Sequence, residues 1–219
     1  MENNQPKTTP AQGVEEAQDI LAKAKSNSKK IVAVSVLVLV CLVAVFAWFF
    51  IAKSGSAKAD DAISRADAAA SANDSTALVL YKDAAKHGYK SGNRAKLEVA
   101  MRLYQEGNYE EALSYLKGAS IDDKIVAAGA LTLEGDCYVN LKKYDEALSA
   151  FNKAVSKADE NPSVVPVILV KEANVYRAQN NYAKEAETLK KIIDEYPQFA
   201  SSNQVDVRKL YERAKASAE

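Results

Sequence analysis

Three segments of the chain repeat one pattern of side chains, and this repetition limits the fold more than any other feature. The matching tyrosines Tyr109, Tyr144 and Tyr182 lie 35 and 38 residues apart. Before each tyrosine comes a small residue that is followed three positions later by Leu or Tyr, in the pairs Ala100 and Leu103, Gly135 and Tyr138, and Ala173 and Tyr176. Two helices approach closely at a small residue, and a large side chain fills the seam between them. Each segment is therefore predicted to be a pair of antiparallel helices that stacks on the next pair.

The composition agrees with an all-α fold. Only 8 glycines and 5 prolines occur in 219 residues, and helix-forming Ala, Leu, Lys and Glu are abundant. The longer second spacing is explained by a loop around Asn161 and Pro162. The third repeat departs from the pattern, because Glu185 stands where the first two have Ala112 and Ala147. This substitution predicts a rotated second helix or a looser crossing there.

An uncharged apolar run from residue 31 to 52 precedes the repeats, with Ser35 its only polar side chain. At ~1.5 Å per residue it reaches about 33 Å, enough for a bilayer core of about 30 Å. Aromatic residues, among them Trp48, gather at its C-terminal end, as at a membrane interface. We therefore predict a transmembrane helix.

Basic residues near the two ends predict the orientation. Four lysines (Lys23, Lys25, Lys29 and Lys30) precede the run, whereas Lys53, Lys58 and Arg65 follow it. This bias favours a cytoplasmic N-terminus and an exported repeat domain. Cleavage at the small-x-small triplet from residue 57 to 59 is the alternative, but the apolar run and its leader are long for a removable signal.

The sequence thus divides into five predicted regions. These are a flexible cytoplasmic tail (1–30), the transmembrane helix (31–52), a linker helix with a degenerate capping repeat (53–93), three repeats (94–200) and a C-terminal capping helix (201–219).

Little in the sequence indicates catalysis. Neither a phosphate-binding loop nor a nucleophile motif is present, and His87 is the single histidine. Cys41 lies in the apolar run and Cys137 in a repeat, so no disulfide is predicted. The carboxylates Asp123 and Asp159 are interpreted as helix-end residues. With 29 basic and 29 acidic residues the net charge is zero, which disfavours nucleic acid. We expect no enzyme activity, no cofactor and no metal.

The repeats resemble tetratricopeptide repeats, whose period is 34 residues. This resemblance implies a concave groove, lined by the first helix of each repeat, that binds proteins or peptides. Carried over position by position, the groove residues are Arg94, Leu97, Glu98, Met101, Tyr104, Thr132, Leu133, Asp136, Val139, Asn140, Val170, Lys171, Asn174 and Arg177. Of the Lys and Asn pairs with which some members hold a C-terminal carboxylate, only Asn174 has a counterpart. An apolar helix or an extended segment is therefore the expected occupant.

The order of tail, anchor, linker helix and repeats resembles the YfgM-like family, an ancillary subunit of the bacterial Sec translocon, in its Bacteroidetes form. That resemblance implies a periplasmic repeat domain on a single-pass inner-membrane protein beside SecYEG, passing exported polypeptides to a PpiD-like chaperone. Alternatives are a scaffold for another envelope complex, such as a secretion or division machine, and a self-associating homodimer.

Overall fold

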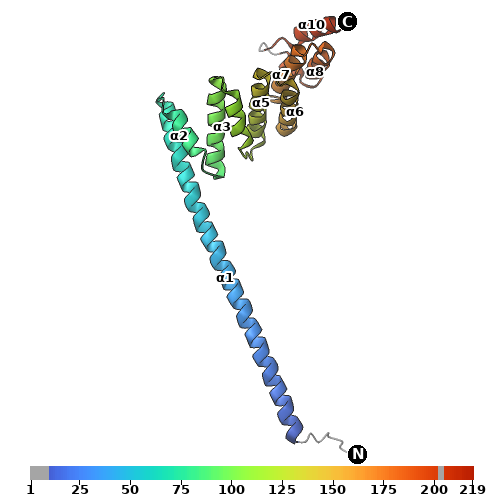
Figure 1. Ribbon diagram of the computed structural model, residues 1–219. Helices are drawn as coiled ribbons and strands as arrows, with labels where there is room; N and C mark the ends of the chain where they lie inside the picture. The colour runs from blue at the N-terminus through green and yellow to red at the C-terminus, as the bar shows by residue number, and fades with distance from the viewer. Residues whose placement is uncertain (1–9, 202–204) are drawn as a thin grey trace, which may run out of the picture. The chain divides into compact units, whose positions relative to one another are not determined.

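The computed structural model describes residues 10–201 and 205–219, and these residues form helices joined by turns, without strands (Figure 1). The helices are α1 (Pro10–Ser71), α2 (Ala77–Ala84), α3 (Tyr89–Gln105), α4 (Tyr109–Lys117), α5 (Lys124–Asn140), α6 (Tyr144–Ala158), α7 (Val165–Ala178), α8 (Tyr182–Glu195), α9 (Pro197–Ala200) and α10 (Val207–Ala218). The predicted all-α class is confirmed. The chain divides into two compact units, residues 1–54 and 55–219.

Helix α1 contains the predicted membrane span. It is the one helix of the described chain that is long and apolar enough to cross a bilayer, and none of its apolar window is buried in the protein. Side chains such as Leu37, Phe46 and Trp48 are 66–71% exposed, which suits lipid rather than water.

The same helix extends further toward the N-terminus than the sequence predicts. Residues 10–30, expected to be a flexible tail, belong to α1. Extending an existing helix costs little once its first turn has formed, and the apolar span supplies that turn. Pro10 is the first residue of α1, a position where its missing N–H costs nothing. Residues 1–9 of the predicted tail lie outside the described residues.

The N-terminal end of the repeat array is closed by the last turns of α1 together with α2. Small side chains of α1, among them Ala62 and Ala66, are buried in one apolar cluster with Tyr81 of α2 and Leu103 of α3. The Tyr81 hydroxyl donates a 2.6 Å hydrogen bond to Asp67. These contacts join the end of α1 and helix α2 to the core of the first repeat.

The three repeats are the helix pairs α3 with α4, α5 with α6, and α7 with α8. Figure 1 shows the pairs following one another along the second unit. The crossing of α5 and α6 requires a glycine, because a Cβ at Gly135 would clash with the ring of Phe151. Asp123 caps α5 by accepting hydrogen bonds from the backbone N–H groups of Ile125 and Val126, both at 2.9 Å.

The C-terminal end is closed by α10, which packs on α8. Here the structure explains the departure at Glu185. This residue is 1% exposed, and its carboxylate accepts a 2.8 Å hydrogen bond from Arg213 of α10. Its second oxygen, Oε2, is buried without a hydrogen-bond partner among the described residues. Glu185 therefore helps to hold the capping helix α10 on α8.

Candidate protein-binding face

The predicted groove residues all lie on α3, α5 and α7, the first helices of the three repeats. None of them is buried, although each of the three helices has a buried side that forms the core. We call this set the groove face. Its side chains remain accessible to a partner while their helices are held by the core.

Polar contacts link the three helices across the groove face. Asn140 donates a 3.4 Å hydrogen bond to the hydroxyl of Tyr104, joining α5 to α3. Lys171 of α7 donates to both carboxylate oxygens of Asp136 on α5, at 2.9 and 2.8 Å. Burial raises the pKa of Asp136, and the neighbouring Lys171 ammonium only partly opposes that rise. The two links connect neighbouring helices whose spacing is set by the buried core.

Apolar side chains occupy the rest of the groove face to different depths. Leu97 and Leu133 pack against the first core cluster, whereas Val139 and Val170 pack against the second. Met101 is 37% exposed, and its flexible thioether side chain adapts to varied shapes. The face therefore offers a partner apolar contact beside fixed polar groups.

One predicted groove residue is engaged elsewhere. The guanidinium of Arg94 reaches Asp67 of α1, with N···O distances of 2.9 and 3.2 Å. Burial acts to raise the pKa of Asp67, but the hydrogen bonds from Tyr81 and Arg94 and the charge of Arg94 together outweigh it and hold that pKa below its usual value. Arg94 thus connects the end of α1 to α3. On α7, Asn174 and Arg177 of the groove face are exposed.

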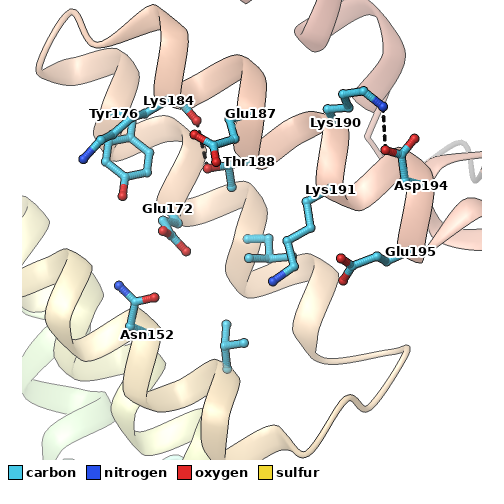
Figure 2. Close-up of a pocket in the computed structure, with 12 residues that line it drawn as sticks. Asn152, Glu172, Tyr176, Lys184, Glu187, Thr188, Lys190, Lys191, Asp194 and Glu195 are labelled. Atoms are coloured by element: carbon cyan, nitrogen blue, oxygen red, sulfur yellow. Dashed lines mark hydrogen bonds and ion pairs between the residues drawn. The ribbon is translucent and has the colours of Figure 1, made fainter.

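A pocket that the sequence did not predict lies between α6, α7 and α8 (Figure 2). Its volume is about 580 Å³. The α7 residues that line it (Leu169, Glu172 and Tyr176) fall on the opposite side of that helix from Lys171 and Asn174, as a 3.6-residue period requires. The pocket is therefore separate from the groove face.

Glu172 is the unusual residue of this pocket. Its side chain reaches in from α7 and is 8% exposed (Figure 2). Burial raises the pKa of Glu172, and Tyr176, Lys191 and Lys184 oppose that rise incompletely. In the sequence Glu172 looks like an ordinary helix-surface charge, so no signal distinguished it.

The described residues contain no group of three or more His, Cys, Asp or Glu side chains placed to hold a metal ion. Cys137 is fully buried, and burial raises the pKa of its thiol to about 12. A protonated, inaccessible thiol is a poor nucleophile.

Comparison with known proteins identifies the repeats. The family described as "Tetratricopeptide repeat-like domain" matches residues 92–177, and the family "Tetratricopeptide repeat" matches residues 168–198. No curated protein matches the sequence.

Solved structures show the same fold. One crystal structure of MamA is 17% identical over 70% of this chain and 94% of its own, with a TM-score of 0.52. A second crystal structure of MamA is 18% identical over 73% of this chain and 87% of its own, with a TM-score of 0.54. At these identities the likeness concerns the fold alone.

Proposed function

Because residues 92–198 match tetratricopeptide repeats, we propose that this protein binds other proteins on its groove face while α1 anchors it in a membrane. The observation that carries the proposal is the accessibility of the whole groove face on helices that are packed into the core and linked by Asp136 with Lys171. A face already fixed in this way loses little conformational entropy when a partner binds.

The partner class follows from the chemistry of the groove face. Met101 and the half-buried Val139 and Val170 offer apolar contact, and Asn174 and Arg177 offer exposed hydrogen-bond donors beside them. An apolar helix or an extended segment with accessible carbonyl groups suits this mixture. Anchoring would confine such a partner near the membrane and raise its effective concentration.

The specific role that we propose is that of an accessory factor at the Sec translocon. In this role the N-terminus is cytoplasmic, the repeats are periplasmic, and the groove face passes exported chains to a PpiD-like chaperone beside SecYEG. Its support is the resemblance in segment order and the lysine bias before residue 31. A scaffold of another envelope complex is the alternative, and it would use the same face.

Copurification tests the partner class. Full-length protein with Met101→Glu and Val139→Glu places two charges on the groove face, and Ser114→Glu at an exposed position of α4 is the control. We expect the double variant to lose partners that the wild type and the control retain when each is purified from membranes. Equal recovery from all three would overturn the groove face as the binding site. Recovered translocon subunits and exported chains would favour the Sec role, whereas one dedicated complex without them would favour the scaffold.

Cysteine labelling tests the orientation. In a Cys41→Ala background, a new cysteine at Gln18 or Ser217 is exposed, whereas Cys137 is buried and stays unlabelled. A membrane-impermeant maleimide added to cells whose outer membrane has been opened should modify the residue-217 cysteine and not the residue-18 cysteine. The reverse pattern would contradict a periplasmic repeat domain.

A further inference from the structure

The pocket between α6, α7 and α8 has an acidic interior with apolar walls. Val155 of α6 and Leu169 of α7 line it beside the buried Glu172 carboxylate. A charged carboxylate at this depth is costly to desolvate unless a cation or hydrogen-bond donors compensate it. The raised pKa of Glu172 shows that its present surroundings compensate it incompletely.

Some charged side chains around the pocket have a partner within the pocket, and others do not. Lys190 forms an ion pair with Asp194 at 2.6 Å, and the ammonium of Lys184 lies 5.4 Å from the centre of the Tyr176 ring. Within the described chain no ion pair of 4 Å or less involves Glu172, Glu187 or Glu195. These three carboxylates share the pocket with two lysines that form no ion pair among the described residues, Lys184 and Lys191, so the lining carries one more negative than positive charge when Glu172 is ionised.

Lys191 is a cation of the pocket lining that already acts on the Glu172 carboxyl. Its side chain crosses from α8 toward the space in front of Glu172, and its positive charge lowers the pKa of that carboxyl (Figure 2). It remains exposed and forms no ion pair with Glu172. A cation from outside that reached Glu172 would complete the compensation that Lys191 supplies only from a distance.

We propose that this pocket binds a lysine or arginine side chain of a partner protein, with Glu172 as the acceptor of its charge. The apolar walls at Val155 and Leu169 contact the aliphatic stem, which long basic side chains readily bury. Asn152 of α6, opposite Glu172, offers a further acceptor at the mouth (Figure 2). The site is distinct from the groove face, so a partner could engage either site alone.

The test uses full-length protein in nanodiscs and fluorescein-labelled alanine peptides that carry one central arginine, lysine or norleucine. Fluorescence anisotropy measures each Kd. We expect the arginine and lysine peptides to bind about tenfold more tightly than the norleucine peptide, as for one charge-assisted hydrogen bond to a buried carboxylate. Equal affinity for the three peptides would overturn the proposal, as would tighter binding of the free polyamine spermidine than of the arginine peptide.

Two variants with opposite expected effects connect the preference to the pocket. Glu172→Gln keeps the shape of the side chain and should remove the preference for basic peptides. Lys191→Met removes the exposed competing cation, so affinity for basic peptides should rise several-fold. Far-UV circular dichroism verifies that both variants fold, and a preference unchanged in both would contradict the assigned site. Loss of groove-face partners in the copurification experiment would leave this result unaffected.

Discussion

The two ends of the repeat array are closed by different physical means. At the N-terminal end, Asp67 accepts hydrogen bonds from Tyr81 and Arg94, and the side chains of Asp67 and Arg94 are 35% and 54% exposed. At the C-terminal end, Glu185 is paired with Arg213 while the Glu185 side chain is 2% exposed. Exposed pairs contribute little to stability, whereas a buried charge depends strongly on its partner. The first cap is therefore held mainly by apolar packing, whereas the second combines the packing of Val207 and Ala214 with a buried carboxylate that depends on its ion-pair partner.

The largest effect is expected from removing the partner of the buried charge. Arg213→Met leaves the Glu185 carboxylate buried and unpaired, which should cost about 3 kcal/mol in the free energy of opening α10. Glu185→Ala restores the residue type found at Ala112 and Ala147, and it should cost much less. Hydrogen exchange of the α8 and α10 amides measures both changes. Equal losses of opening free energy in the two variants would show that the cost does not come from leaving the Glu185 carboxylate unpaired.

A helix crossing inside the array provides a reference between the two ends. Gly135→Ala directs a methyl group into the Phe151 ring and should destabilise the α5–α6 pair by about 2 kcal/mol. Gly129→Ala on the same helix meets open space, so it should stabilise by up to about 1 kcal/mol. Urea unfolding followed by circular dichroism in nanodiscs compares the two. If both substitutions had the same sign, close packing would not be the reason for the small residue at position 135.

Smaller effects are expected at the N-terminal cap. Tyr81→Phe removes the donor of the 2.6 Å hydrogen bond to Asp67 and should cost about 1 kcal/mol. Arg94→Gln removes a more exposed contact and should cost about 0.5 kcal/mol or less. Exchange rates of the α2 and α3 amides report both values. A loss at Arg94 as large as that at Arg213 would remove the distinction between the two ends.

The two halves of the array should also respond to pH in opposite directions. Because the pKa of Asp67 is lowered in the folded state, its stabilising contribution is complete above its unfolded value of about 3.8 and is lost as pH falls through the folded pKa. Because the pKa of Glu172 is raised, its carboxylate destabilises the fold as pH rises from about 4.5 through the folded pKa.

Asp67→Asn should therefore remove the loss of stability toward low pH, and Glu172→Gln should remove the loss of stability toward higher pH. Exchange protection measured in α2 and in α7 between pH 3 and pH 7 checks this expectation. If the change of exchange protection with pH stayed the same in these variants, the pH dependence would belong to other groups.

The sequence predicted the helices well because their determinants are local. The crossing residues, the tyrosines that begin α4, α6 and α8, and the cap at Asp123 each act within one helix pair. The role of Glu185 could not be predicted in this way, because its partner Arg213 is 28 residues further along the chain. The prediction of a rotated helix or a looser crossing was made from the residues of the third repeat alone.

The candidate sites were predictable to different extents. The groove residues follow from the resemblance to tetratricopeptide repeats, carried over position by position, and the structure leaves all of them accessible. The use of Arg94 by Asp67 and the buried position of Glu172 depend on neighbouring helices, which a single-repeat pattern does not describe. Position along the repeat thus indicated which face is accessible, but not which charges are already engaged.

The central claim is that the groove face holds a protein partner of a membrane-anchored chain. A photocrosslinking amino acid at Met101 or Val139 in the full-length protein, irradiated in native membranes, tests it most directly, with the exposed Ser114 on α4 as the control position. We expect the two groove positions to capture the same proteins and residue 114 to capture none of them. Capture of the same proteins from all three positions, or of none from the groove face, would contradict it.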